Sequence, residues 1–348
     1  NHSKPAVPFG GKYRLIDVPL SNSINSHIDT IFVIAQFLTT ELQKHIQSTY
    51  FFSSLSEGKI HFLTPQENAK GEKIWFEGTA DAVRKNLELF SKTKLDYFLI
   101  LSGDQLYNID FQEMFAFAKE KDADLTIAAL PVEKKSAPSL GLLEINEEKR
   151  IQRFVEKPQE EAELESLKMP DELYEQLGFQ DDLTPHYLAS MGIYIFKRKA
   201  LEDLLLNEPE EDFGKHLIPK EIQKGKTFAY VFKGYWEDIG TIQSFYEANL
   251  ALVQGHLGLD IYDEKSPIFA KPNHLPGPII RSSSIKNTIV SDGCTIDAKE
   301  ITNSIIGPRV QIGKGAIIRN NIIMGINDPY SNQTSITKLG ENRLIENT

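Results

Sequence analysis

The sequence contains four short clusters of polar residues, each of which either follows an apolar run or begins an amphipathic segment. They are WFEGTADAVR (75–84), LSGD (101–104), FVEKP (154–158) and GYWEDIGT (234–241). In an open α/β sheet, ligands bind outside the carboxyl ends of the strands, so four such clusters predict one crevice lined from several strand ends. Two carboxylates, Asp104 and Asp238, could meet there across a metal-bound phosphate. The pattern indicates phosphoryl or nucleotidyl chemistry.

The two aspartates are the candidate metal ligands. Asp104 follows the apolar run YFLIL and a glycine, and Asp238 follows FAYVF. An aspartate after a strand is most often a turn or a helix cap, but Thr241 is available to cap the helix after Asp238. Two carboxylates around Mg²⁺ would neutralise a triphosphate and orient its α-phosphorus for in-line attack. We therefore predict a magnesium site made by Asp104 and Asp238.

Basic residues near the same clusters are candidates for binding phosphate. Lys157 stands at a strand end before Pro158, where its compact charge would suit a sugar phosphate, although a lysine in a turn is usually a surface residue. Lys4, Lys12 and Arg14 concentrate positive charge around PFGG in an otherwise acidic chain. Any phosphate site must therefore be a local basic pocket.

A helix start lies within the first cluster. Gly78, Thr79, Ala80 and Asp81 are small or polar, so a nucleotide could approach closely, and free N–H groups at a helix start favour phosphate. The same residues would also serve as a plain helix start, with Asp81 favourable to the dipole. Both interpretations remain open from the residues alone.

Composition limits the classes of function. The chain has 348 residues, a formal net charge of -11 and no basic stripe, so a nucleic-acid partner is not expected. Its longest apolar runs are strand-sized, far short of the ~20 residues of a membrane helix, and we expect no membrane partner. The single cysteine, Cys294, excludes an internal disulfide and fits a reducing compartment, the cytoplasm or a plastid. The eight histidines show no metal-binding spacing.

The first two-thirds of the chain alternates strand-like and helix-like segments. Strands are predicted at 30–35, 59–63, 97–101, 125–130, 192–196 and 228–232, and helices at 79–90, 111–120, 199–206 and 241–253. The acidic stretch 159–184 is expected to be a solvated excursion with one or two helices. This alternation predicts an α/β fold built from right-handed βαβ units with a mostly parallel sheet.

A different texture follows a proline-rich linker. Ile306, Ile312, Ile318 and Met324 recur every six residues, and glycine follows three of them. A six-residue repeat is typical of a parallel β-helix with its aliphatic residues pointing inward, whereas a sandwich edge would show period two. We predict a catalytic domain over 1–258, a linker over 259–278 and a β-helix over 279–348 that is cut short or capped.

Seven segments together resemble the glucose-1-phosphate adenylyltransferase (ADP-glucose pyrophosphorylase) family of sugar nucleotidyltransferases. They are KPAVPFGGKYRLIDVPLSNSINS, WFEGTADAVR, LSGDQLY, FVEKP, SMGIYIF, DFGKHLIP and GYWEDIGTIQSFYEANL. The resemblance covers nearly the whole chain, and GYWEDIGT is most similar to the plant and cyanobacterial form. It implies a Rossmann-like catalytic domain with a C-terminal left-handed β-helix, in a homotetramer or heterotetramer. It also implies formation of ADP-glucose and pyrophosphate from ATP and α-D-glucose 1-phosphate.

The resemblance also implies roles for particular residues. It assigns Asp104 and Asp238 to Mg²⁺, and Lys4 to the ATP phosphates. It assigns glucose 1-phosphate to Phe76, Gly141, Glu156, Lys157 and Ser190, and the nucleotide to Gln36, Gly78, Thr79, Ala80 and Asp81. Arg14 is the residue expected to meet an anionic metabolite effector. The family's glycine-rich phosphate loop would stand before Lys4, so the sequence is expected to begin inside the motif that follows that loop.

Three alternatives compete with a catalytic adenylyltransferase. A regulatory subunit would bind effector and partners without turnover, but it would have no need to keep Asp104, Lys157 and Asp238. A transferase using UTP or dTTP is disfavoured by the ADP-glucose signatures. A hexapeptide acyltransferase is disfavoured because His256 and His274, the only histidines beyond Trp236, lie outside the repeats.

Overall fold

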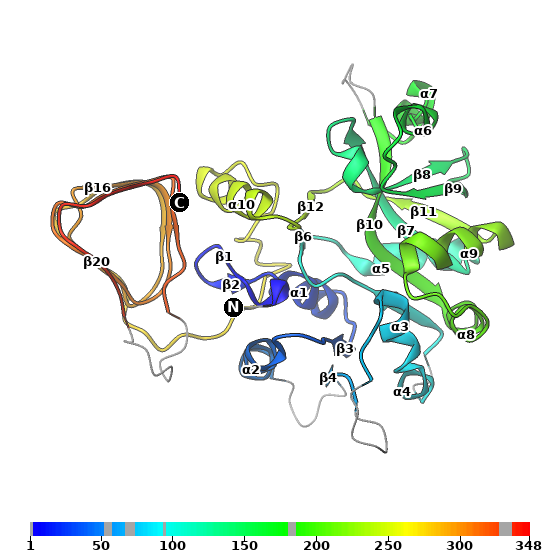
Figure 1. Cartoon of the computed structure of the whole chain (residues 1–348), viewed down its shortest axis with the longest axis horizontal. Helices are drawn as coiled ribbons and strands as arrows, with labels where there is room; N and C mark the ends of the chain where they lie inside the picture. Colours follow the sequence, from blue (N-terminus) through cyan, green and yellow to red (C-terminus); the bar gives the residue numbers. More distant parts are fainter. Residues whose placement is uncertain (1–2, 52–57, 67–73, 93–94, 180–185, 327–335) are drawn as a thin grey trace.

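The computed structural model describes residues 3–51, 58–66, 74–92, 95–179, 186–326 and 336–348. Figure 1 shows two parts, an α/β part and a triangular coil of strands that stands beside it. The predicted α/β class followed by a parallel β-helix is confirmed. Within the described residues, no helix combines the length and the apolar character needed to cross a membrane.

A six-stranded sheet forms the centre of the α/β part. Its order is β11-β7-β10-β8-β9, with β5 also pairing with β10. The strands are β5 (Tyr97–Ile100), β7 (Leu125–Glu133), β8 (Gly141–Ile145), β9 (Ile151–Glu156), β10 (His186–Lys197) and β11 (Thr227–Val231). A separate parallel pair, β3 (Thr30–Ile34) with β4 (Lys59–Leu63), lies in the N-terminal third of the chain. All six strands predicted from the sequence are present.

The pairing within the six-stranded sheet differs from the mostly parallel arrangement predicted. β7 and β11 are parallel, but β10 is antiparallel to β5, β7 and β8. The cause is the β8–β9 hairpin, absent from the sequence prediction, which reverses the chain once before β10. Helices α6 (Glu161–Ser166) and α7 (Asp171–Gln176) follow the hairpin, as expected for the acidic excursion, whose residues 180–184 lie outside the described residues.

Helices cover both faces of this sheet. On one face α3 (Thr79–Arg84), α4 (Leu87–Ser91), α8 (Arg198–Asn207) and α9 (Ile218–Lys224) pack onto a cluster that includes Ile127. On the other face α1 (Asp17–Asn25), α5 (Phe111–Glu120) and α10 (Ile242–Gln254) pack onto a cluster that includes Ala128. Neighbouring residues of β7 thus point to opposite faces, as a strand buried on both sides requires. Helix α2 (Thr39–Thr49) packs on a smaller cluster with β3 and β4.

One predicted helix is divided. Residues 79–90 were expected to form a single helix, but α3 ends at Arg84 and α4 begins at Leu87. Asn86, which is buried at the junction, donates from its side chain to the carbonyl of Ala82 at 2.8 Å. An asparagine that bonds the preceding turn competes with the backbone ladder of a helix, which accounts for the break.

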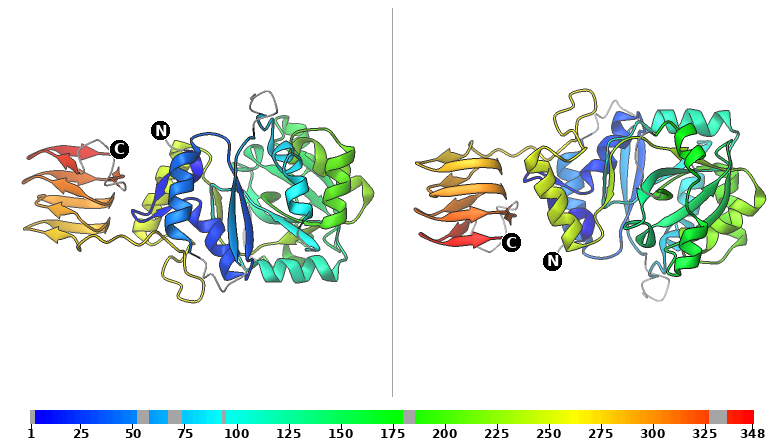
Figure 2. Two further views of the ribbon diagram at one scale, coloured as in Figure 1. Left: turned by 90° about the horizontal axis from the view of Figure 1, so that it is seen from below. Right: turned by 90° about the horizontal axis from the view of Figure 1, so that it is seen from above.

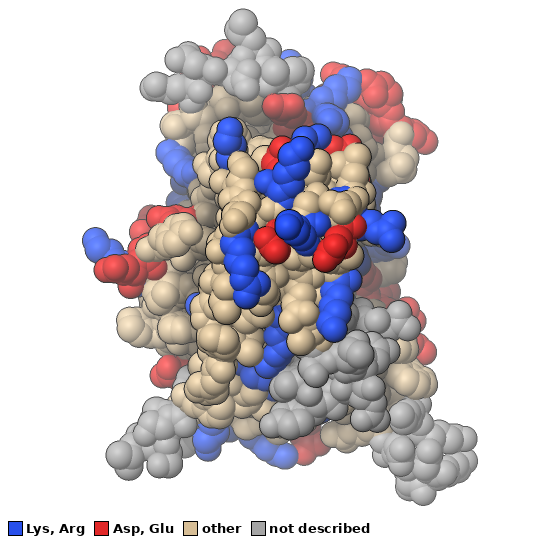
Figure 3. Space-filling model, turned by 90° about the vertical axis from the view of Figure 1, so that its left-hand side faces the viewer, with Lys and Arg blue, Asp and Glu red and all other residues tan. Residues whose placement is uncertain are grey.

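The β-helix stacks its coils in parallel, as Figure 2 shows from two sides. Its strands are β13 (Ile279–Ile280), β14 (Ser284–Val290), β15 (Thr295–Ile296), β16 (Glu300–Ile306), β17 (Val310–Ile312), β18 (Ile317–Arg319), β19 (Ile322–Ile323), β20 (Thr337–Leu339) and β21 (Leu344–Glu346). Ile306, Ile312 and Ile318 are buried inside the coil, as predicted from the six-residue spacing. Figure 3 shows the outer face, where Lys and Arg side chains are scattered among acidic and uncharged ones.

Met324 does not follow the inward pattern predicted for it. Its side chain is 44% exposed. A Cβ atom built on Gly307 would lie 2.1 Å from the carbonyl oxygen of Met324, so the two backbones are in direct contact. Gly307 therefore admits the backbone of Met324 to the wall of the coil, and the methionine side chain turns outward.

The two parts meet along α10 and along a glycine hairpin. The hairpin joins β1 (Pro8–Phe9) to β2 (Tyr13–Arg14) through Gly10 and Gly11, both at positive φ. Gly10 N–H donates to Asn249 of α10 at 3.0 Å, and the Ser291 hydroxyl, beside β14, donates to the Gly11 carbonyl at 2.8 Å. On α10, the Tyr246 hydroxyl donates to the Asn320 carbonyl of the coil at 2.8 Å. Direct hydrogen bonds thus connect the N-terminal segment, α10 and the β-helix.

Candidate active site

The two candidate metal ligands lie side by side on a short ribbon. Strand β6 (Gln105–Tyr107) pairs antiparallel with β12 (Trp236–Asp238), and Asp238 stands opposite Gln105. The N–H of Ile239 donates to the Asp104 carbonyl at 3.2 Å, which closes the end of the ribbon. The Ser102 hydroxyl donates to one Asp104 carboxylate oxygen at 2.6 Å. The ribbon therefore fixes both aspartates next to each other, although 134 positions separate them in the sequence.

The charges of four predicted residues act on one another at this point. Burial raises the pKa of Asp238 above its ordinary value, and the neighbouring charge of Asp104 raises it further. The positive charges of Lys4 and Lys157 act in the opposite direction on that pKa. Lys4 also donates from Nζ to the Gly240 carbonyl at 2.9 Å, two residues beyond Asp238. The structure thus brings Asp104, Asp238, Lys4 and Lys157 into one cluster.

The two carboxylates fit a magnesium ion that also binds substrate phosphates. In the described part of the chain, no group of three or more His, Cys, Asp or Glu side chains could hold a metal. Mg²⁺ is commonly held by one or two carboxylates together with substrate phosphates, and it prefers oxygen ligands. The mutual repulsion of Asp104 and Asp238, visible in the raised pKa of Asp238, is what a bound cation would relieve. The donor set is therefore suitable for Mg²⁺ once a phosphate is present.

Lys157 and Glu156 stand together at the end of β9. Their charged atoms, Lys157 Nζ and Glu156 Oε1, are 3.9 Å apart. Lys157 has a φ of 51°, a left-handed backbone conformation, and its N–H donates to the Leu140 carbonyl at 3.1 Å. A Cβ atom on Gly141 would lie 2.8 Å from Glu156 Oε2, so glycine leaves room for that carboxylate. The sequence prediction that Gly141, Glu156 and Lys157 share a site agrees with this geometry.

Two further charged residues complete this region and had no predicted role. Burial raises the pKa of Glu156, the charges of Lys157 and Lys215 lower it, and that of Asp212 raises it. Asp212 accepts from the N–H of Lys215 at 2.9 Å, at the start of the π-helix η3 (Phe213–Leu217). A Cβ atom on Gly214 would lie 2.9 Å from Glu156 Oε2. The segment DFGK was part of the resemblance, and this motif was the available signal for Asp212 and Lys215.

Ser190 lies where the pairing of β10 with β7 is interrupted. The register shifts between Ser190 and Tyr194, and Gly192 has a φ of 68° within this bulge. The N–H of Gly192 donates to the Ser190 hydroxyl at 3.2 Å. The pKa of the Tyr194 hydroxyl is raised by burial and by the charges of Glu156 and Asp212. Tyr194, which hydrogen-bonds to Ser190, is thus close enough to feel the charge of the Glu156 carboxylate, and the sugar pocket that Ser190 would share with Glu156 remains a prediction.

The helix start at Gly78 is not an open anion site. The N–H groups of Ala80 and Asp81 both donate to the Glu211 carbonyl, at 2.8 and 3.2 Å. The Asp81 carboxylate accepts from the Glu77 N–H at 2.9 Å and pairs with Lys85 at 2.6 Å. The prediction of free N–H groups here is therefore wrong, because a distant loop already occupies them. Contact of Gly78, Thr79, Ala80 and Asp81 with a nucleotide remains a prediction.

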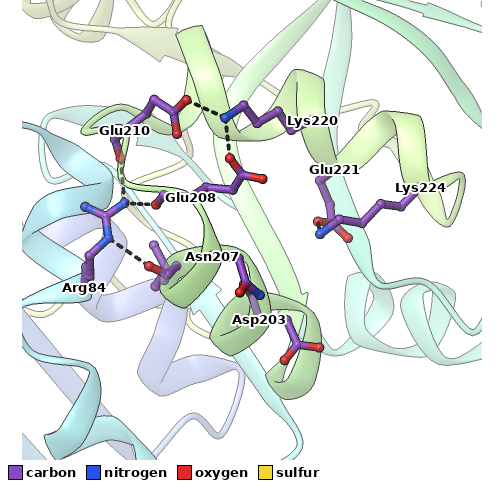
Figure 4. A network of polar contacts seen from close by, with 9 residues as sticks. Arg84, Asp203, Asn207, Glu208, Glu210, Lys220, Glu221 and Lys224 are labelled. Carbon is purple, nitrogen blue, oxygen red and sulfur yellow. Dashed lines mark hydrogen bonds and ion pairs between the residues drawn. The ribbon is translucent and has the colours of Figure 1, made fainter.

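An arginine holds that loop against the helix, as Figure 4 shows. Arg84 donates to the carbonyls of Leu205, Glu208 and Glu210 at 2.9, 2.8 and 2.6 Å. Lys220 of α9 forms ion pairs with the carboxylates of Glu208 and Glu210. Thr79 in turn accepts from the N–H of Phe213 at 3.3 Å. The GTADAVR segment therefore positions the loop that carries Asp212.

Gln36 and Phe76 are brought together, but through the backbone. The Gln36 amide donates to the Phe76 carbonyl at 3.2 Å and accepts from the Phe76 N–H. The rings of Phe37 and Trp75 stack beside them with centroids 5.4 Å apart. The Gln36 amide thus holds the WFEG segment in place. Its contact with a nucleotide, and that of Phe76 with a sugar, remain predictions.

Arg14 lines a separate cavity of about 520 Å³. Lys12, Lys44 and Lys271 add positive charge to the lining, which also contains Phe51 and the carboxylate of Glu41, 3.8 Å from the Arg14 guanidinium. A buried network supports this wall: Asp17 accepts from the Arg14 N–H at 2.7 Å and from the Tyr50 hydroxyl at 2.8 Å, and lies 2.6 Å from His45 Nε2. The cavity has the size of a small-molecule site, and its basic side chains outnumber the single carboxylate of Glu41.

Two family models match this chain, one over each of its two parts. Residues 1–255 match the family model described as nucleotidyl transferase. Residues 273–346 match the model described as the GLGC left-handed parallel beta-helix domain. The second match supplies the handedness predicted for the C-terminal coil.

Proposed function

The chain belongs to the nucleotidyl transferase family, and from this premise we propose that it transfers AMP from ATP to α-D-glucose 1-phosphate. The products are ADP-glucose and pyrophosphate, for glycogen or starch synthesis. The order of the two matched domains supports this choice, because a GLGC β-helix follows the transferase domain. The sequence resemblance supports the same substrates.

The convergence of four charged residues is the observation that carries the proposal. Asp104 and Asp238 lie on one ribbon, and the charges of Lys4 and Lys157 act on Asp238. Nucleotidyl transfer to a sugar phosphate brings the three phosphate groups of ATP and the one of the sugar together, and a cation site flanked by positive charges offsets their repulsion. This cluster offers that arrangement in one place.

Each residue of the cluster has a role in the proposed reaction. Asp104 and Asp238 would hold Mg²⁺, which supplies charge neutralisation of the triphosphate when bound. Lys4, whose Nζ donates to the Gly240 carbonyl, would instead donate to the ATP phosphates when ATP binds. Lys157 would bind the phosphate of glucose 1-phosphate, while Glu156 and Ser190 face its hydroxyl groups. Gly141 keeps space for Glu156.

The chemical step is a direct displacement. An oxygen of the sugar phosphate attacks the α-phosphorus of ATP, the bond to the β-phosphate breaks, and pyrophosphate leaves with the bonding electrons. No general base is needed, because a phosphate monoester is already an anion. The contribution of the protein is therefore positioning and electrostatic stabilisation, which dominate catalysis of phosphoryl transfer.

Regulation and assembly belong to the same proposal. The Arg14 cavity, with Lys12, Lys44 and Lys271 in its lining, would take an anionic phosphorylated metabolite. Assembly into a homotetramer or heterotetramer would cover apolar side chains that are exposed in the single chain. Phe37 is 64% exposed and Trp75 is 45% exposed, and the two rings stack on each other.

The test is pyrophosphate release by the full-length protein with Mg²⁺, glucose 1-phosphate and each of four nucleoside triphosphates. We expect turnover with ATP above the others and a response to 3-phosphoglycerate. Preference for UTP or dTTP would overturn the choice of nucleotide. A folded protein that binds ATP without turnover would instead be a regulatory subunit.

Site variants sharpen the same test. Asp104→Asn should reduce turnover by about 100-fold or more, whereas Asp96→Asn, at the other end of β5, should leave it unchanged. Lys157→Ala should raise KM for glucose 1-phosphate far more than KM for ATP. Lys314→Ala, an exposed lysine of the β-helix, is the control for loss of one positive charge. Near-normal kinetics of both site variants would contradict the assignment.

A further inference from the structure

Gln105 is a buried amide beside the proposed metal ligands. It follows Asp104 directly and stands opposite Asp238 on the β6–β12 ribbon. Its side chain is only 5% exposed. Among the described residues, nothing donates a hydrogen bond to its Oε1 atom. A polar group this buried normally has a partner, so this amide oxygen needs an explanation.

The other end of the amide locates the side chain. A Cβ atom built on Gly192 would lie 3.3 Å from Gln105 Nε2, so the amide faces the bulge of β10. Gly192 in turn donates to the Ser190 hydroxyl, which belongs to the proposed sugar pocket. Gln105 therefore lies between the metal ligands on one side and the sugar pocket on the other.

An unpaired amide is expensive for the free protein. Leaving a buried acceptor without a donor destabilises a folded protein, and an apolar side chain of the same shape would avoid that cost. Methionine is such a side chain, with similar length and flexibility. Glutamine at position 105 is therefore not explained by stability. It indicates that a hydrogen-bond donor reaches Oε1 when the substrate binds.

We propose that Gln105 determines specificity for the sugar, by accepting a hydrogen bond from a hydroxyl group of the bound sugar 1-phosphate. This inference rests on the proposed function and adds a contact to the same site. A sugar hydroxyl both donates and accepts, so it satisfies either orientation of the amide. A site with a buried hydrogen-bonding group rejects a ligand that lacks the matching hydroxyl.

The experiment compares Gln105→Met with the wild-type full-length protein. We expect KM for glucose 1-phosphate to rise about tenfold, the worth of one such hydrogen bond, with KM for ATP unchanged. We also expect the midpoint of thermal unfolding to stay level or rise. Thr126→Val is the matched control, because Thr126 is fully buried in the sheet and its hydroxyl also lacks a described partner. It should leave both KM values unchanged.

Deoxy sugars identify the hydroxyl. Among the 2-, 3-, 4- and 6-deoxy analogues of glucose 1-phosphate, one should show equal kcat/KM with wild type and Gln105→Met. If no analogue does so, or if the variant loses thermal stability with an unchanged KM for the sugar, Gln105 has a structural role and the inference is wrong. Calorimetric titration with glucose 1-phosphate separates the two proposals. Wild-type binding without turnover overturns only the reaction, and absence of both overturns the reaction and the inference together.

Discussion

A single methyl group at the tip of the glycine hairpin should loosen the contact between the two domains. Gly11 has a φ of 74°, and a Cβ atom there would lie 2.7 Å from the Ser291 hydroxyl and 3.3 Å from Ile305. The left-handed backbone costs an alanine about 1 kcal/mol. Ser291 must also move, which forfeits its 2.8 Å bond to the Gly11 carbonyl, about 1 kcal/mol more. Gly11→Ala should therefore destabilise the protein by about 2–3 kcal/mol.

Gly255 provides the matched control. Its φ is 73°, but nothing lies within 4 Å of its Cβ position, so Gly255→Ala incurs the backbone cost alone, about 1 kcal/mol. Urea unfolding would be followed by tryptophan fluorescence, since Trp75 and Trp236 both lie in the transferase domain, and by circular dichroism for the whole chain. The difference between the two alanine variants measures the contact with the β-helix.

A second substitution tests the cause. Ser291→Ala removes the atom that the new methyl group would meet, so combining it with Gly11→Ala should cost about 1 kcal/mol less than the two separate changes added together. Two results would refute the reasoning: equal destabilisation by the two glycine variants, or strict additivity of Gly11→Ala with Ser291→Ala. Either result would mean that the hairpin tip does not contact the β-helix in solution.

Three further outcomes follow from the site and the domain contact. Because the pKa of Asp238 is raised, its carboxyl group binds a proton more tightly in the folded protein than in the unfolded chain. The free energy of unfolding therefore falls as pH rises through the ordinary carboxyl range near about 4. The fall should be at most about 0.5 kcal/mol, because Asp238, although partly desolvated by its neighbours, still contacts solvent that screens its charge. Asp238→Asn should abolish the fall in urea titrations at several pH values without Mg²⁺, and turnover should be lost. Gly78→Ala would place Cβ 2.3 Å from the Glu211 carbonyl oxygen, so it should destabilise the fold by about 2 kcal/mol in urea and raise both KM values in the pyrophosphate assay. Tyr246→Phe removes the bond to the Asn320 carbonyl and should lower the free energy of unfolding by about 1 kcal/mol with unchanged turnover; a loss of activity would show that this contact reaches the site.

The sequence was sufficient to select Asp104 and Lys157 as candidates from their polar motifs, but the expected shared edge of parallel strands does not explain their position, because β9 runs opposite to β5. Asp104 and Lys157 each follow an apolar run that the structure confirms as a strand or its end. What the sequence could not supply is the three-residue ribbon that sets Asp104 beside Asp238, because strands so short carry no periodicity. The bond from Lys4 to Gly240 spans 236 positions and likewise has no local signal.

The failures of prediction have the same origin. The N–H groups after Gly78 were expected to be free, since a helix start has no internal partners for them. The Glu211 carbonyl, remote in sequence, takes two of them. The β8–β9 hairpin reversed the direction of β10, although its charged turn at residues 147–150 between two apolar runs was a readable signal. Local sequence patterns thus predicted the helices and strands. Contacts with loops distant in sequence determined which backbone polar groups remained free to bind a ligand.

One corner of the β-helix has a consequence for how the coil can be lengthened. Gln254 of α10 donates to Asn303, Asn303 to Asn320, and Asn320 to Asn347, at 2.9, 2.8 and 3.0 Å. The three asparagines share a left-handed backbone, with φ between 51° and 56°. Yet 17 positions separate the first two asparagines and 27 separate the next two.

The spacing of this amide chain in space is therefore independent of how many residues each turn of the coil contains. Insertions elsewhere around the triangle leave the asparagine corner in register with α10. This corner keeps the coils aligned with α10. New loops, tags or recognition segments can therefore be inserted at the remaining corners without disturbing the transferase domain.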